Sequence, residues 1–236
     1  MNLPRVLRGF LNVPVTSRLQ PVYRSLYIQV QETPNPLSLK FLPPKVILDH
    51  PGTYEYNNVG AAKSSPLARE LFLVNGVRSV FFGEDFITVT KKDEDTDWGV
   101  MRAEILSTIA NFIESGKPAI IPNGSPPTYE DTAIHEEDDD TVAMIKELLD
   151  SRVRPMVQED GGDITYVGFD DGVVKLKLKG SCTGCPSSSV TLKSGIQNML
   201  QVYVPEVKEV IEVTDDSDDL VQQELDKFER SRGIHD

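Results

Sequence analysis

The stretch "DITYVGFDDGVVKLKLKGSCTGCPSSS", residues 163–189, contains two strand patterns, a turn and both cysteines of the chain. β-branched and aromatic residues dominate 163–169, and Asp170-Asp171-Gly172 after them is typical of a hairpin turn. In 173–179 valine and leucine alternate with lysine, which predicts a strand with one apolar and one charged face. Pro186 suits the first turn of a helix. The stretch therefore predicts a hairpin that leads through a cysteine loop into a helix.

Apolar periodicity on both sides of this hairpin completes a unit over 141–213. Before it, a helix carries Arg152 and Arg154 in its predicted last turn, where cations complement the helix dipole. Two apolar stripes indicate the helices, and they consist of Val142, Ile145, Leu148 and Leu149, and of Leu192, Ile196, Met199 and Leu200. "VKEVIEV", residues 207–213, predicts a third strand. The expected order of elements is αββαβ.

A second folded unit is predicted over 28–114. "SLKFL" (38–42), "VRSVFF" (77–82) and "FITVT" (86–90) have strand composition. Ser65 can cap a helix that starts at Pro66, and a later helix carries an apolar stripe of Trp98, Met101, Ile105, Ile109 and Phe112, with Asp97 or Thr96 as its cap. The order is strand, strand, helix, strand, strand, helix, or ββαββα. Both units are α+β, with helices layered on a sheet.

Three segments lie outside these units. Residues 1–27 contain arginine but no acidic residue, and an amphipathic pattern near Arg5 and Arg8 predicts a mitochondrial presequence; a disordered cytosolic tail is the alternative. Residues 115–140 mix proline, glycine and acids and are predicted to be a linker. Residues 214–236 form an acidic tail.

The charge and hydropathy of the chain exclude some classes of partner. The 236 residues carry a formal net charge of −13, which argues against a nucleic-acid binder. No apolar run is long enough to span a bilayer, so we expect no membrane insertion.

The pair Cys182 and Cys185 can serve as a dithiol, as part of a metal site or as inert structural thiols. The pair comes just before a predicted helix, whose free N–H groups favour a thiolate, and Gly180 and Gly184 allow the backbone to bend tightly. We therefore predict that both thiols are accessible and anionic rather than structural.

The length of chain after the cysteines and the number of available ligands separate the remaining alternatives. A thioredoxin-like dithiol/disulfide oxidoreductase also places such a pair at a helix start, but it needs several more elements after the cysteines than 51 residues with an acidic tail provide. A zinc site needs four ligands, and His50, His135 and His235 fall in three different segments. An iron–sulfur cluster needs four thiolates, which two chains related by a two-fold axis would supply. That arrangement suits a carrier.

Residues 154–200, with "EDGGD" at 159–163 and "GSCTGCPSS" at 180–188, closely resemble the NFU-type (NifU C-terminal-like) iron–sulfur scaffold domain. The first unit resembles the N-terminal domain of mitochondrial members, through "TPNPLSLKF", "SPLARELF" and "GVRSVFFGEDFITVTK". The likeness extends from about residue 28 to residue 213.

This resemblance implies a carrier of the mitochondrial matrix with Cys182 and Cys185 as cluster ligands. It implies a [4Fe–4S] cluster, although [2Fe–2S] stays open, and a homodimer when the cluster is bound. Its clients would be lipoyl synthase and respiratory-chain iron–sulfur subunits, with upstream cluster-assembly factors as donors. We expect no enzymatic activity, because a carrier needs no general base and the chain has no nucleotide-binding loop, zinc-protease helix or hydrolase elbow.

Overall fold

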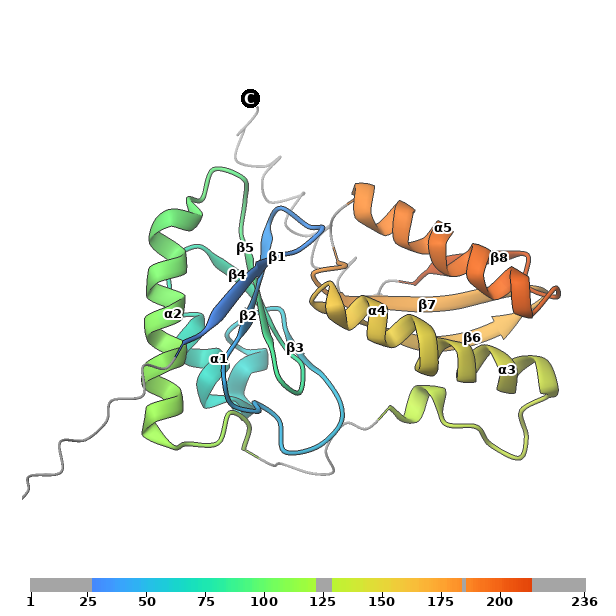
Figure 1. Ribbon diagram of the computed structural model, residues 1–236, viewed down its shortest axis with the longest axis horizontal. Helices are drawn as coiled ribbons and strands as arrows, with labels where there is room; N and C mark the ends of the chain where they lie inside the picture. Colours follow the sequence, from blue (N-terminus) through green and yellow to red (C-terminus); the bar gives the residue numbers. More distant parts are fainter. Residues whose placement is uncertain (1–26, 122–128, 184–185, 214–236) are drawn as a thin grey trace, which may run out of the picture.

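The computed structural model describes residues 27–121, 129–183 and 186–213, without the side chains of 186–189. The predicted presequence (except Tyr27), the predicted acidic tail at 214–236 and Cys185 lie outside the described residues. The chain forms two α+β units, as predicted. The two units lie side by side (Figure 1). Among the described residues, none of the helices combines the length and apolarity that crossing a membrane requires.

A five-stranded antiparallel sheet forms the first unit, in the order β1-β2-β5-β4-β3. Its strands are β1 (Gln29–Glu32), β2 (Ser38–Leu42), β3 (Tyr54–Tyr56), β4 (Val77–Phe82) and β5 (Ile87–Lys91). Its helices are the 3₁₀ turn η1 (Ala61–Ser64), α1 (Pro66–Leu71) and α2 (Trp98–Ser115). Three strands precede α1 where the sequence predicted two. The short β3 pairs only with β4, at the edge of the sheet.

Capping residues set the helix starts of the first unit. The Ser65 hydroxyl accepts the Ala68 N–H at 3.0 Å, and the Asp97 carboxylate accepts the Gly99 N–H at 2.8 Å. These bonds satisfy N–H groups that have no partner within the helix. Both predicted caps are therefore confirmed, and α1 and α2 place their apolar residues against the sheet.

The opposite face of this sheet is polar but also buried. Lys40, Thr88 and Thr90 are at most 7% exposed, although alternation places them away from the helices. Figure 1 shows the reason: α2 lies on one side of the sheet and the second unit on the other. The first sheet is thus a middle layer between its own helices and the second unit.

The second unit contains a three-stranded sheet in the order β6-β7-β8. β6 (Gly162–Asp170) and β7 (Val173–Gly180) form the predicted hairpin, and β8 (Glu209–Glu212) pairs parallel to β7. The helices are η2 (Glu130–Thr132), α3 (Asp140–Leu148), η3 (Leu149–Val153), α4 (Arg154–Glu159) and α5 (Pro186–Tyr203). Val174, Leu176 and Leu178 of β7 are buried beneath them, as the alternating pattern predicted.

The first helix of this unit is longer than the sequence indicated. The prediction that Arg152 and Arg154 lie in its last turn is wrong, because the chain continues through the π-helical turn η3 into α4. Pro155 lacks an N–H and would break a regular α-helix, but here it falls at the start of α4, where that N–H is not needed. The consecutive helical elements α3, η3 and α4 are called the rod below. Arg154 lies inside the rod rather than at its end.

Arg154 is buried and binds a set of acidic side chains. Its Nη1 donates to Asp163 Oδ1 at 2.9 Å and to the Ile164 carbonyl at 3.0 Å. Its Nη2 donates to the Asp131 carboxylate at 3.1 Å, and its Nε to Asp150 at 3.2 Å. Asp163, 1% exposed, also accepts the Thr53 hydroxyl of the first unit at 2.7 Å. One guanidinium therefore ties residue 131, the rod and the start of β6 together.

We predict that Arg154→Met lowers the free energy of unfolding by about 3–5 kcal/mol, because it leaves buried carboxylates without their cation. Burial raises the pKa of Asp163, and Arg154 opposes that effect. Without Arg154 the folded-state pKa of Asp163 should lie further above its unfolded value. The folded variant would then take up protons as the pH falls, so its deficit should be smaller at low pH than at high pH.

Urea unfolding at several pH values measures this effect. The exposed neighbour Arg152, which lies over the Tyr203 ring, provides the control. Arg152→Met should cost at most about 1 kcal/mol with no such pH dependence. An equal loss in the two variants would contradict the assigned role of Arg154.

Candidate functional site

Cys182 lies in the loop that connects the end of β7 to α5. Gly180, the last residue of β7, has a φ of 66°, which turns the chain sharply. The Ser181 hydroxyl donates to the Asp160 carbonyl at 2.7 Å, and the Ser181 N–H donates to the Gly161 carbonyl at 3.3 Å. These bonds hold the start of the cysteine loop against the end of α4.

Gly161, just before β6, and Gly162, its first residue, make room for this loop. A Cβ atom on Gly162 would lie 2.5 Å from the Cys182 sulfur and 2.6 Å from the Lys179 carbonyl oxygen. Gly161 has a φ of 84°, and its Cβ atom would lie 2.8 Å from Thr88 Oγ1 of the first unit. The Gly161-Gly162 pair thus lets the cysteine loop and the first unit both approach the start of β6.

The Cys182 thiol differs from the prediction of an accessible, anionic sulfur. The residue is 6% exposed and packs with the apolar core of the second unit. Burial raises the pKa of the thiol to about 12, and the Ser181 hydroxyl opposes this only in part. α5 begins at Pro186, so Cys182 precedes the first turn, to which the favourable field of a helix N-terminus is confined. The thiol is therefore protonated at neutral pH.

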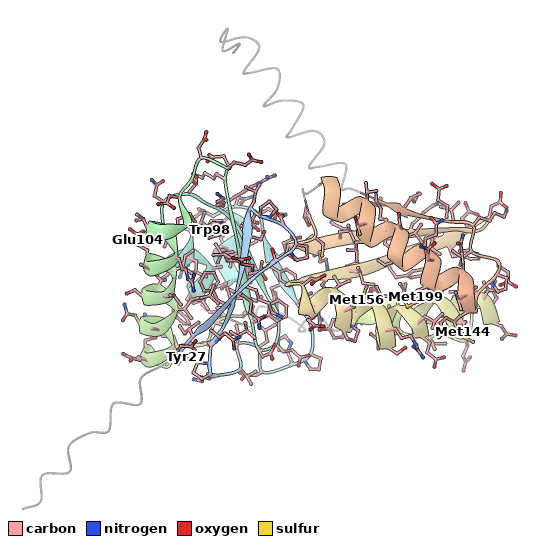
Figure 2. All side chains as sticks on the ribbon, turned by 45° about the horizontal axis from the view of Figure 1, so that its top comes forward. Tyr27, Trp98, Glu104, Met144, Met156 and Met199 are labelled. Carbon is pink, nitrogen blue, oxygen red and sulfur yellow. The ribbon has the colours of Figure 1, made fainter. Side chains whose placement is uncertain are left out.

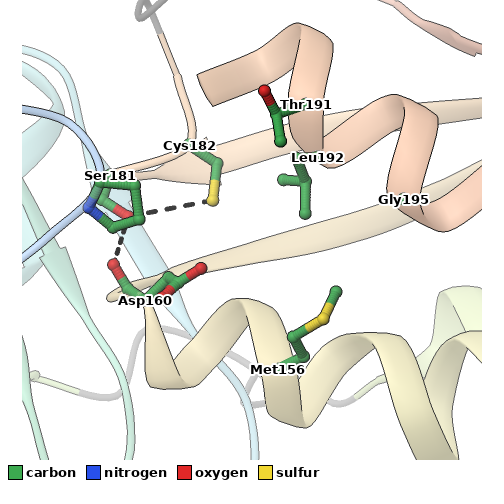
Figure 3. A pocket seen from close by; sticks show the side chains of 8 residues that line it. Met156, Asp160, Ser181, Cys182, Thr191, Leu192 and Gly195 are labelled. Carbon is green, nitrogen blue, oxygen red and sulfur yellow. Dashed lines mark hydrogen bonds between the residues drawn. The ribbon is translucent and has the colours of Figure 1, made fainter. Parts of the chain in front are cut away.

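A cavity of about 440 Å³ opens beside Cys182 (Figure 3). Figure 3 shows the sulfur directed into the space between α4 and α5, with Met156 and Leu192 on opposite sides. Residues of both units line the cavity: Pro34, Met156, Asp160, Ser181, Cys182, Thr191, Leu192 and Gly195. Among the described residues, the arrangement offers one thiol in a largely apolar setting at the junction of the two units.

Asp160 lines the same cavity as this sulfur, but the described residues do not form a complete metal site around it. In the ranges it describes, no group of three or more His, Cys, Asp or Glu side chains could hold a metal ion. His50 lies near Tyr54 in the first unit, and the His135 N–H donates to Asp138 near the start of α3. Cys185, the other predicted ligand, lies outside the described residues.

Sequence reasoning missed the contribution of the first unit to the cysteine loop. The Asn35 side-chain amide donates to the Ser181 carbonyl at 3.0 Å and to the Thr183 carbonyl at 3.3 Å. Glu55 Oε1 accepts the Gly180 N–H at 2.9 Å. The only local signal was an asparagine between two prolines in "TPNP", and such a pattern indicates a turn without naming its distant partner.

Two family models match the chain. One is described as "NifU-like domain" and matches residues 145–211; the other is described as "Scaffold protein Nfu/NifU N terminal" and matches residues 28–116. A relative from Drosophila willistoni, named "NFU1 iron-sulfur cluster scaffold homolog, mitochondrial", is 53% identical over 88% of this chain and 71% of its own length.

Two further matches come from another organism and from a solved structure. The protein of the same name from Homo sapiens is 54% identical over 87% of this chain and 79% of its own length. A solution NMR structure of a NifU-like protein from Saccharomyces cerevisiae is 23% identical, covers 52% of this chain and all of that one, and superposes with a TM-score of 0.39.

We predict that Gly162→Ala displaces Cys182, because the added methyl group would overlap the sulfur and the Lys179 carbonyl. Overpacking of this kind should lower the free energy of unfolding by about 1–3 kcal/mol. Gly168→Ala, in the same strand but with nothing within 4 Å of the added atom, is the matched control. Urea unfolding compares the two variants, and equal stability would show that the loop adapts to the methyl group.

Proposed function

Because the chain belongs to the family of NFU1-type iron–sulfur cluster scaffold proteins, we propose that it binds a cluster as cargo through Cys182 and Cys185. Its relatives are named as mitochondrial scaffolds, and this chain is accordingly a mitochondrial iron–sulfur cluster scaffold protein. The finer assignments, namely the matrix, the ligand pair, the cluster type and the clients, are part of the proposal.

The position of Cys182 is the observation that carries the ligand assignment. Its sulfur lies in the wall of the cavity between α4 and α5, so a bound group would have space on one side and a packed core on the other. Thiolates are the usual protein ligands of iron–sulfur clusters. The largely apolar lining around the Cys182 thiol gives no comparable support to a hard cation such as Mg²⁺, which prefers oxygen ligands.

The protonated state of the thiol fits cargo that must leave. A thiol ligates iron as the thiolate, so loading has to displace the Cys182 proton and unloading returns it. The high pKa of about 12 favours the protonated, unloaded side of this equilibrium. Cargo binding is therefore coupled to loss of the Cys182 proton.

The same property disfavours the dithiol/disulfide oxidoreductase alternative. A nucleophilic cysteine needs a lowered pKa and an accessible sulfur, whereas Cys182 is buried and its pKa is raised. We therefore assign the chain no catalytic step.

Ligand number sets the proposed stoichiometry. One chain supplies two thiols, and a [4Fe–4S] or [2Fe–2S] cluster held by four thiolates needs two chains. We propose a [4Fe–4S] cluster shared by a homodimer. The proposed clients are lipoyl synthase and respiratory-chain subunits, and upstream cluster-assembly factors would supply the cluster.

Anaerobic reconstitution tests the cargo. We expect about two iron and two acid-labile sulfide per chain, with the visible absorbance of a thiolate-bound cluster. Cys182→Ser and Cys185→Ser should each abolish all three signals. Because Cys182 packs in the core, circular dichroism must show that its variant is folded before the loss is interpreted. Zinc without sulfide, or iron retained by either folded variant, would contradict the proposal.

Sedimentation tests the shared cluster. We expect the loaded protein to be a dimer and the protein without iron to shift toward monomer, because ligand bonds contribute to association. Removing iron with a chelator should reverse the shift. A loaded monomer in buffer without added thiol would contradict the shared-cluster arrangement while leaving a cargo site intact.

A further inference from the structure

We propose that Asn35 of the first unit is a latch that positions the cysteine loop and controls access to Cys182. The latch rests on the proposed function only for its biological purpose, which is to retain and release cargo. The hydrogen bonds that form the latch are those of the protein without a cluster. Asn35 touches neither sulfur nor cavity contents in this proposal, so it is a positioning residue.

Asn35 sits in a rigid turn. Pro34 and Pro36 on either side restrict the backbone, and the Thr33 hydroxyl donates to the Asn35 carbonyl at 2.8 Å. The Leu37 N–H donates to Asn35 Oδ1 at 2.9 Å, which assigns that atom as the oxygen and directs the NH₂ group outward. Trp98, labelled in Figure 2, lies at the start of α2. Its Nε1 donates to the Pro36 carbonyl of the turn at 3.3 Å.

The outward NH₂ group binds the backbone on both sides of Cys182. It donates to the carbonyls of Ser181 and Thr183, and Asn35 itself is 2% exposed. A single side chain therefore fixes the peptide units before and after the cysteine. Few residues are better suited to this than asparagine, whose amide offers two donors and one acceptor within one short group.

Contacts within the second unit also hold this part of the loop: Ser181 binds Asp160 and Gly161, and the Thr183 N–H donates to the Gly180 carbonyl at 3.3 Å. From the first unit, Glu55 binds Gly180 before the cysteine, whereas Asn35 binds residues on both sides of it. Pro34, next to Asn35, also lines the cavity into which the sulfur points. When the Asn35 bonds break, the first unit loses its hold on the residues that flank Cys182, one of the two proposed ligands.

Two consequences follow from this geometry. In the closed state Cys182 stays 6% exposed and external thiols or oxidants reach its sulfur slowly. In the open state residues 181–183 have lost the Asn35 bonds and are held by the second unit alone, so the loop can shift away from the first unit and present Cys182 to an acceptor. The first unit is therefore one wall of the cargo site, beyond any role in docking.

Asn35→Asp is the sharpest test. The carboxylate is nearly the same size and can still accept the Leu37 N–H, so the turn is retained. It has no N–H to donate, and it places a negative charge against two carbonyl oxygens. Asn111→Asp is the control, since it makes the same chemical change on the exposed face of α2.

Alkylation of Cys182 by N-ethylmaleimide in the apo protein is the first readout. The Asn35→Asp and Asn111→Asp proteins both also carry Cys185→Ser, so that intact-mass spectrometry follows the alkylation of Cys182 alone. We expect Asn35→Asp to accelerate alkylation about tenfold or more, from the loss of two hydrogen bonds, and Asn111→Asp to leave the rate unchanged. Equal rates in the two folded variants would overturn the latch.

A measurement on the chain with its natural Asn35 keeps the test independent of variant folding. Cys182 alkylation is followed at urea concentrations below the unfolding transition. Local opening of the loop predicts a rate that depends weakly on urea, whereas a steep dependence equal to that of global unfolding would overturn the latch.

Cargo release is the last readout and separates the two proposals. With both natural cysteines present and the cluster reconstituted, Asn35→Asp should transfer iron to a chromogenic chelator about tenfold faster than Asn111→Asp, because the same opening limits both processes. If no chain binds iron and sulfide, the proposed function fails while alkylation still decides the latch. If loaded chains release iron at equal rates, the latch fails and the cargo assignment stands.

Discussion

The buried polar face of the first sheet is the constraint on which the rest of the structure depends. Lys40 and Thr88 would each lose hydrogen bonds to water on burial, at a cost that only new partners can offset. The second unit supplies backbone carbonyls for both: Lys40 Nζ donates to Gln158 at 2.9 Å and Glu159 at 3.1 Å, and Thr88 donates to Gly161. Burial lowers the pKa of Lys40, and Asp85 and Glu159 oppose that effect. Side chains of one unit thus satisfy the main chain of the other, at the end of α4 and the start of β6.

The cysteine lies next to this interface. Gln158, Glu159 and Gly161 contact the first sheet, and Asp160 and Gly161 of the same segment hold Ser181. Cys182, the next residue, packs with the apolar core of the second unit, and this burial raises the pKa of its thiol. The protein combines a poor resting environment for a thiolate with a cavity that can admit a ligand, and this combination fits transient binding better than permanent binding.

Local features of the fold could be predicted from the sequence, and long-range ones could not. The β6–β7 hairpin, the caps at Ser65 and Asp97 and the apolar stripes follow from patterns within a few residues. The edge strand β3 is only three residues long, so its Tyr-Glu-Tyr alternation is too short to indicate a strand. The continuous rod across Pro155 escaped because a proline normally indicates a helix boundary, whereas here a π-helical turn precedes it.

The candidate site could likewise be predicted only where the signal is local. Cys182 was identified from its spacing to Cys185 and from family resemblance, both of which are sequence properties. Its burial was mispredicted because Cys182 packs with core residues that its own segment does not indicate. Asn35, which holds the loop from the other unit, lies 146 residues from its partner Ser181 in the chain. A pattern of neighbouring residues contains no information about such partners.

The long sequence separation of the interface has a consequence for folding. Closing a loop of more than one hundred residues costs chain entropy before any contact is gained, so such contacts form late. The hairpins β4–β5 and β6–β7 involve short separations and can form early. The cysteine loop then acquires its final shape only after both units exist and have met. A chain that is truncated or misfolded in either half would never complete the pocket, which makes a competent site a marker of a fully folded molecule.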